Sequence, residues 1–343
     1  MSSNSLTSSF NLGVQTAHAA EAATYNTALA TVSALNVEFD EQEPRLEHPS
    51  TVARSTAVKT APLRKSAGTM LEATFALYPN FLGTVLRGLG MGVSSVDGTG
   101  FYTHTFTIAL DAACPYLSAM HKMVGTSASL ERKALNVQLS QLSIEAGLDE
   151  IMCSITGEGD AEANSAGTET KAAETAIELS TLTGTYTPII GADTSTAYVH
   201  GSHTFTIDNA LKSKQRRLWS AAYSPIVRES IGASGTLSGI DIDADTYEYY
   251  QNIQRGGSGG TAVSLTPATG SMAFNYKSAG VIGVTAAYYS LTVTLPSVYW
   301  TLANFQSSGN ELIRCDATYT MVDNVATPLT IVLVNNVAGY PLP

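Results

Sequence analysis

The sequence predicts a mainly β (α+β) protein in which each half consists of antiparallel strands and one short helix. Three observations support this prediction. Apolar and polar residues alternate over many short segments, and a period of two is typical of strands with one buried face. One short helix is expected in each half, from the spacing of apolar residues after Pro79 and from a capping box at Asp245. The pentapeptide His-Thr-Phe-Thr-Ile occurs at 104–108 and again at 203–207, which suggests that a strand-rich unit is used twice.

The first 66 residues are rich in Ser, Thr and Ala and show weak periodicity. We therefore expect 1–66 to form an N-terminal arm with loops and one strand near Val32–Phe39. Met70–Leu77 predicts a strand, because every second residue is apolar. Pro79 then begins a short helix, and the glycines from Gly88 onward end it. The apolar face of this helix consists of Phe81, Leu82, Val85, Leu86 and Leu89.

The next strands show the clearest pattern in the chain. Tyr102–Ile108 and Ile151–Ile155 alternate between apolar and polar residues. Between them, the alternating apolar residues of Leu135–Leu139 continue, after a slip of one residue, at Leu142. An inserted residue exchanges the two faces of a strand, so this slip predicts a β-bulge.

The second half contains the same kinds of element. It opens with an expected pair of strands at His203–Ile207 and Lys212–Tyr223. Asp245-Thr-Tyr-Glu248 has the form of a capping box and predicts a helix that runs through Ile253 and ends at Gly256. Further strands are expected where apolar residues alternate, over 289–295, 313–321 and 329–333.

A chain of 343 residues is long enough for two domains of roughly 150 residues each. We place the first at 67–160, with strands from the arm, and the second at 203–343, joined by an acidic, Ser/Thr-rich junction at 161–202. The strands that carry Cys153 and Cys315 lie about half the chain apart, and we take them as the better marker of a repeat. The repeated pentapeptide has a different offset and mostly reflects strand composition.

The composition favours a subunit of an assembly over a freely diffusing enzyme. Charged residues make up 14% of the chain, against about 25% in typical soluble domains. The net charge is −11, and residues 145–178 contain nine acidic residues and one cation, Lys171. Tight binding to nucleic acid depends on Lys and Arg that neutralise phosphates, so it is disfavoured. The acidic run is either a solvated linker and sheet edge or a surface past which DNA can slide.

A basic cluster follows in the second half. It consists of Lys212, Lys214, Arg216 and Arg217. Three interpretations stay open: a solvated face of a hairpin, a contact with nucleic acid, or an electrostatic contact with a neighbouring subunit. In the last case the partner residues would be Glu158, Asp160 and Glu162, and the contact would set register rather than supply much free energy.

No group of residues with the spacing of a catalytic, cofactor or metal site is found in the sequence. Asp241–Asp245 begins like a calcium loop, but Thr246 and Asn252 stand where such a loop needs Gly and Glu. The three cysteines are far apart and are expected to be buried free thiols. His104 and His203 are expected to be half-exposed strand residues. The sequence therefore predicts a protein that is not an enzyme and has no cofactor and no metal.

Targeting signals are not expected either. The N-terminal residues lack the basic start and the apolar core of a signal peptide. No apolar run approaches the roughly 18 residues that a membrane-spanning helix needs. We expect the chain to remain in the cytosol where it is made.

In its order of segments, the chain resembles the tail tube proteins of long-tailed (siphovirus-type) bacteriophages, in their two-domain form. The resemblance covers most of the chain and rests on strand and turn patterns whose order matches the family. The segments that carry it are Asn11–Thr16, Leu77–Gly90, Thr103–Thr107, Leu135–Gly159, Cys315–Thr320 and Leu329–Asn336.

The resemblance implies two tandem β-sandwich or barrel domains, each with one short flanking helix. It implies a structural virion protein whose edge strands join into a homotrimeric, pseudo-hexameric ring, and rings stacked into a hollow tail tube. Double-stranded DNA would pass through a negatively charged lumen without sequence-specific binding. A tape-measure protein would fill the lumen during assembly, and tail-terminator and tip proteins would bind the ends. The arm and the loop at 254–264 would be contacts between rings.

The resemblance also implies a location in the virion tail, after assembly in the host cytoplasm. An alternative from another class is a surface-layer or adhesive β-sandwich protein, which the expected lack of a signal peptide disfavours.

Overall fold

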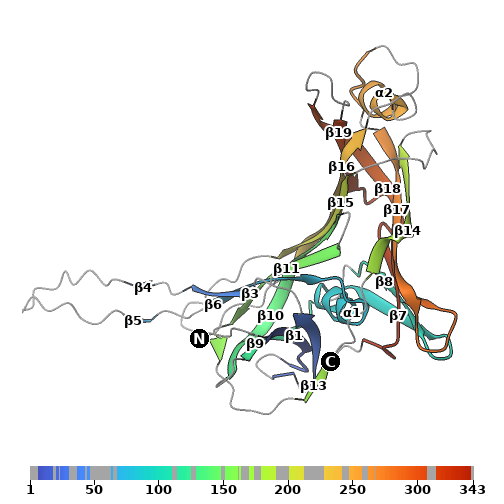
Figure 1. Ribbon diagram of the computed structural model, residues 1–343. Helices are drawn as coiled ribbons and strands as arrows, with labels where there is room; N and C mark the ends of the chain where they lie inside the picture. Colours follow the sequence, from blue (N-terminus) through green and yellow to red (C-terminus); the bar gives the residue numbers. More distant parts are fainter. Residues whose placement is uncertain are drawn as a thin grey trace, which may run out of the picture.

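The computed structural model is a mainly β protein with two short helices, as the sequence predicts (Figure 1). It describes residues 7–17, 21–22, 24–30, 37–42, 45–46, 63–64, 68–109, 114–124, 129–147, 151–160, 162–163, 170–173, 179–190, 201–211, 228–241, 247–256, 262–266, 268–306 and 314–340. The helices are α1 (Pro79–Gly88) and α2 (Tyr247–Arg255). The strands are β1 (Thr7–Val14), β2 (Thr24–Ala30), β3 (Val37–Gln42), β4 (Arg45–Leu46), β5 (Leu63–Arg64), β6 (Gly68–Ala76), β7 (Gly92–Asp97), β8 (Tyr102–Thr107), β9 (Leu117–Val124), β10 (Ser129–Ala146), β11 (Ile151–Asp160), β12 (Glu162–Ala163), β13 (Thr170–Ala173), β14 (Leu179–Ile190), β15 (Ser202–Leu211), β16 (Arg228–Asp241), β17 (Ala268–Val281), β18 (Tyr288–Gln306), β19 (Arg314–Met321) and β20 (Thr330–Asn335).

The largest layer is an antiparallel sheet of eight strands. Their order is β3-β6-β11-β10-β15-β16-β19-β18. Strands β3 and β6 extend away from the body of the molecule, and the two-stranded pair β4–β5 lies beyond them, at the left of Figure 1. We refer to these eight strands as the long sheet.

A second antiparallel layer of six strands packs against the long sheet. Its order is β7-β8-β20-β18-β17-β14. Strand β18 belongs to both layers, because Ser290–Thr294 pair with β20 and Val298–Gln306 pair with β19. In the upper part of Figure 1, β15, β16 and β19 form one wall and β14, β17 and β18 the other. We refer to this second layer as the short sheet.

Strand β10 is shared in a similar way. Its N-terminal part pairs with β9, and its C-terminal part pairs with β11 and β15. Beyond β9 this layer continues with β1, β2 and β13, in that order. Strands β1 and β2 come from the predicted arm. The β2–β13 pair is parallel. The arm therefore contributes strands to the body of the protein.

The predicted β-bulge is confirmed. The pairing of β10 with β11 shifts register between Leu139 and Gln141, so that Ser140 is the extra residue. Leu139 and Leu142 are both fully buried, because the inserted residue returns the apolar positions to the same face.

The core lies between the two sheets and beneath α1. Phe75 and Phe81 meet edge to face with ring centroids 4.9 Å apart, and Phe10 of β1 packs against both. The predicted helix α1 begins at Pro79, and Gly90 with a φ of +73° follows its end. Its expected apolar face is buried throughout. Helix α2 also forms where predicted, while its proposed cap Asp245 lies outside the described residues.

The two predicted tube domains are joined by main-chain hydrogen bonds. Strand β10 of the first range pairs with β15 of the second, and β8 pairs with the C-terminal strand β20. Apart from the pair β4–β5, the described strands thus form one connected sheet system, and the division at 161–202 stays a prediction. Of the strand pair expected at 203–207 and 212–223, the first lies within β15, and the second, with basic residues 212–217, lies outside the described residues.

The two cysteine-bearing strands occupy equivalent places in the long sheet. Cys153 lies on β11, which pairs with β6, the strand immediately before α1. Cys315 lies on β19, which pairs with β16, the strand immediately before α2. The pentapeptides do not correspond in this way, because β8 belongs to the short sheet and β15 to the long sheet.

Replacing Phe75 with Ala should lower the free energy of unfolding by about 3–5 kcal/mol, because it leaves a cavity between Phe10 and Phe81. Urea unfolding followed by fluorescence measures this change. The control is V325A, at a position that is 39% exposed, where the expected change is within about 0.5 kcal/mol. Equal effects of the two substitutions would contradict the packing described above.

Candidate functional site

The outer face of the long sheet concentrates negative charge. This is the face turned away from the core. Five acidic residues and one cation lie on it, among the described side chains of β6, β11, β15, β19 and the C-terminal part of β10. The acidic residues are Glu72, Glu145, Glu158, Asp208 and Asp316, and the cation is Arg314. Between them lies a cross-strand row of hydroxyls, Thr74–Ser154–Ser143–Thr206–Ser234–Thr320. This acidic face suits contact with water and repels polyanions.

The outer face of the short sheet is different. Three cross-strand rows cover it, and Ser and Thr fill most of their positions. The rows are Val96–Thr103–Val334–Ser290–Lys277–Ser180, Ser94–Thr105–Val332–Thr292–Asn275–Thr185 and Gly92–Thr107–Thr330–Thr294–Ala273–Thr187. Lys277 is the one charged residue in these three rows. Its ammonium lies 3.8 Å from the centroid of the Tyr288 ring. The two outer faces therefore differ in charge although both are rich in hydroxyls.

Both sheets end in edges that carry no partner strand within the described part of the chain. In the long sheet these edges are β3, which pairs with β6 alone, and the end of β18 beyond Trp300, which pairs with β19 alone. In the short sheet they are β7 and β14. Unpaired N–H and C=O groups on an edge are a template for another strand.

The expectation that His203 is half-exposed is wrong, because its side chain is buried between the sheets. Its Nδ1 lies 2.8 Å from the hydroxyl of Tyr276, and its Nε2 lies 2.7 Å from the hydroxyl of Tyr319. Burial raises the pKa of both tyrosines. A cavity of about 200 Å³ borders His203. His203 and Tyr319 lie on the long sheet, on β15 and β19, and Tyr276 lies on β17 of the short sheet. The histidine therefore links the two sheets.

The same expectation is wrong for His104, which is fully buried. Its Nε2 donates to the carbonyl oxygen of Val337 at 2.9 Å and to Oδ1 of Asn335 at 3.1 Å, and its Nδ1 accepts from the Ser95 hydroxyl at 2.8 Å. Asn335 in turn donates to the hydroxyl of Tyr340, which packs edge to face on the His104 ring. This network fastens the C-terminal residues to β8.

The C-terminal residues also hold α1 in place. The Tyr340 hydroxyl donates to the carbonyl oxygen of Asn80, and Asn335 donates to that of Pro79. The Tyr340 ring lies so close to Gly83 that a Cβ at this position would come within 2.0 Å of it. The glycine therefore allows the close approach of helix and tail.

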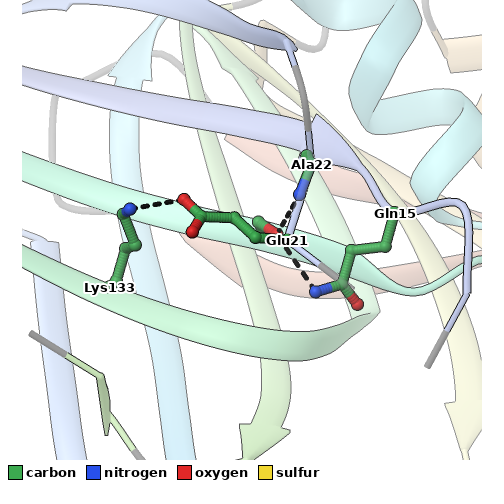
Figure 2. Close-up of polar contacts among 5 residues, drawn as sticks. Gln15, Glu21, Ala22 and Lys133 are labelled. Carbon is green, nitrogen blue, oxygen red and sulfur yellow. Dashed lines mark hydrogen bonds and ion pairs between the residues drawn. The ribbon is translucent and has the colours of Figure 1, made fainter. Parts of the chain in front are cut away.

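A third polar cluster anchors the connection between β1 and β2 (Figure 2). Lys133 of β10 is 1% exposed, and its ammonium donates to the carboxylate of Glu21. Ser118 of β9 accepts from Gln15 Nε2 and from the backbone N–H of Ala22, each at 3.0 Å. Both ends of the connection are therefore tied to the neighbouring strands.

The predicted subunit contacts are only partly within the described residues. Glu158 lies partly exposed on the acidic face. The backbones of Asp160 and Glu162 belong to β11 and β12, but their side chains lie outside the described residues. Lys212, Lys214, Arg216 and Arg217 lie outside them entirely. The proposed electrostatic contact thus stays a prediction.

The cysteines are buried free thiols, as predicted. Burial raises the pKa of the Cys153 thiol, and it raises that of Cys315 to about 11, so neither is a reactive thiolate at neutral pH. Among the described residues, no group of three or more His, Cys, Asp or Glu could hold a metal ion. No helix in the described part of the chain has the length and hydropathy to cross a membrane.

A scan against protein-family models finds no match, and a search of curated proteins finds no similar sequence.

Removing the Glu21 carboxylate should cost more than removing the Lys133 ammonium. In E21Q the buried ammonium loses a charged partner, and we expect a loss of about 1.5–3 kcal/mol in the free energy of unfolding. In K133M the buried side chain becomes apolar, and the Glu21 carboxylate that loses its partner is 38% exposed and can be hydrated, so we expect a smaller loss. Urea unfolding of both variants checks this order, and a larger loss in K133M would contradict it.

Stability should fall as the pH drops from about 7 to about 5. Burial lowers the pKa of His104 and of His121, and Arg132 adds to the effect at His121. The unfolded chain therefore binds protons first, so the stabilisation is complete above roughly pH 6.5 and is lost below it. Thermal melts across this range measure the effect. H104N should be less stable at pH 7 and should show a shallower pH dependence; an unchanged slope would contradict the assignment.

Proposed function

We propose that the chain is a structural subunit of a hollow tube, the tail tube of a long-tailed bacteriophage. The observation that carries this proposal is the construction of the long sheet from two four-stranded groups. The first is β3-β6-β11-β10 and the second is β15-β16-β19-β18. They join edge to edge at β10–β15, where Gln141–Ala146 pair with His203–Asp208.

This junction is a template for joining one subunit to the next. It connects the last strand of the first group to the first strand of the second. The same connection between copies would pair β18 of one subunit with β3 of its neighbour. Neighbouring strands of the long sheet alternate in direction. Because the sheet has an even number of strands, β3 and β18 run in opposite directions, so the new pair would also be antiparallel. Such a head-to-tail contact closes into a ring when its rotation divides a full turn.

The charge of the long sheet supports its placement around the lumen. Its outer face carries Glu72, Glu145, Glu158, Asp208 and Asp316. An acidic wall repels phosphates, so double-stranded DNA could pass without being held. The short sheet, with its nearly uncharged outer face, would then lie on the outside of the tube.

The ring symmetry and the partner proteins that the resemblance implies belong to the same proposal. Each four-stranded group with its helix would be one tube domain, so that three chains make a ring with pseudo-sixfold symmetry. The lumen would hold a tape-measure protein during assembly in the host cytoplasm, and terminator and tip proteins would bind the two ends of the tube in the virion. The equivalent places of Cys153 and Cys315 support the duplication.

Negative-stain electron microscopy and mass measurement of the purified protein test this function. Rings of three chains, or hollow tubes built from them, are the expected result. A protein that stays monomeric at high concentration would overturn the proposal. A flat two-dimensional lattice would favour the alternative of a surface-layer protein.

Proline substitutions on the edge strand β3 test the ring contact. Successive residues of an edge strand direct their N–H groups alternately toward the partner and away from it. One of D40P and E41P should therefore abolish rings in a folded protein, while the other removes a β3–β6 hydrogen bond and destabilises the fold. Gel filtration with circular dichroism separates the two effects. As matched controls, S94P and S95P on β7 should leave rings intact; loss of rings only in the β7 variants would contradict the assignment.

A further inference from the structure

Two fully exposed aliphatic residues mark the two ends of strand β17. Leu265, just before the strand, and Val284, just after it, are fully exposed. Val263 and Val281 beside them are 72% and 42% exposed. A single exposed aliphatic residue needs no explanation. Here, however, each end of one strand presents an aliphatic residue with a second one beside it.

Both apolar ends are held by hydrogen bonds. Around Val284, the N–H of Ile282 donates to the carbonyl oxygen of Ala287 at 2.7 Å, and the hydroxyl of Thr285 donates to that of Ile282 at 2.7 Å. Around Leu265, the N–H of Ser264 donates to the carbonyl oxygen of Gln254 at 2.8 Å. The N–H of Thr266 also donates to the Ser264 hydroxyl at 3.2 Å. Because the turns are preorganised, a partner would order little chain on binding them.

The Val284 end is also supported by the neighbouring hairpin. The β7–β8 turn lies beside it, since a Cβ at Gly100 would come within 3.1 Å of the Thr285 methyl group. Val96 of β7 is 63% exposed and adds to the apolar surface of the short sheet. We refer to residues 278–288, which include Val281 and Val284, as the hairpin tip, and to residues 262–266, which include Val263 and Leu265, as the α2 end.

Charge favours contact between these two places. The chain carries a net charge of −11, so two copies repel each other over most of their surface. The hairpin tip, over 278–288, and the α2 end, over 262–266, contain no charged residue. They therefore bring no acidic residues of two copies together, and the cations that flank them, Lys277 and Arg255, lie over the rings of Tyr288 and Tyr250.

The hairpin tip and the α2 end lie at opposite ends of β17, so a contact between them can repeat from copy to copy. The 14 residues of β17 separate the two places by roughly 45 Å at about 3.3 Å per residue. A contact between the tip of one copy and the α2 end of the next is head-to-tail, and a copy shifted along the strand offers the same two surfaces again. When its rotation does not close a ring, a head-to-tail contact extends from copy to copy.

We propose that the hairpin tip of one subunit packs against the α2 end of a subunit in the next ring, and that this apolar contact stacks the rings. The inference rests on the proposed tube function and names the residues of its axial contact. Contacts within a ring use the edges of the long sheet, whereas this contact uses the ends of β17. Rings and their stacking are therefore separable.

Substitutions of Val284 and Leu265 test the contact by electron microscopy and sedimentation. V284K and L265E should each form rings that fail to stack, with loss of all particles longer than one ring. The double variant V284K/L265E should restore tubes, because stacking brings the introduced ammonium of one copy to the introduced carboxylate of the next. The control V325D places a charge at an exposed valine away from β17 and should leave tubes unchanged.

The outcomes separate the two proposals. Tubes of normal length in both single variants would overturn the axial contact and leave the tube function standing. Loss of stacking in V325D as well would overturn it too, since the effect would then be one of charge alone. Wild-type protein that forms no rings would overturn the tube function and, with it, this contact.

Discussion

The architecture depends on the main-chain hydrogen bonds of two long strands that each serve two sheets. Strand β10 changes partner from β9 to β15 along its length, and β18 changes from β20 to β19. Every backbone N–H and C=O in a buried strand must find a partner. Each of these strands pairs with one neighbour along one half of its length and with a different neighbour along the other half. In this way the two strands connect all the major layers. The two sheets can then diverge without leaving buried backbone groups unpaired.

The low content of charge has a structural consequence. Both sheets present an outer face to solvent, and Ser and Thr cover most of the positions that charged residues would fill in a typical domain. Among the described side chains, acidic residues gather on the outer face of the long sheet, while that of the short sheet is nearly neutral. Charge in the described part of the chain is therefore distributed unevenly between the two outer faces, and the proposed placement of the lumen follows from this difference.

The buried histidines show how far pattern alone could go. His104 is in phase with Phe106, and His203 is in phase with Phe205. Since alternate residues share a face, each histidine had to lie on the apolar face, and this signal was present in the sequence. The partners were not predictable, because Tyr319 and Asn335 are more than 100 residues away along the chain. A histidine's general preference for half-exposed positions was overridden by partners that satisfy both ring nitrogens.

The sequence by itself determined the strands with a clear period of two, both helices, the bulge at Ser140 and the buried thiols, because local periodicity and turn chemistry set these features. Strands β9, β14, β16 and β17 were not predicted, and β14 lies within the segment expected to be a junction. Only the tertiary structure decided which strands are neighbours. The pairing of β8 with β20 joins the first half to the C-terminus, and β10–β15 joins the two halves of the long sheet. Strand pairing over such distances depends on the packing of both sheets at once, and a period of two is the same for any partner. For that reason the acidic face, the free edges and the apolar ends of β17 appeared only in three dimensions.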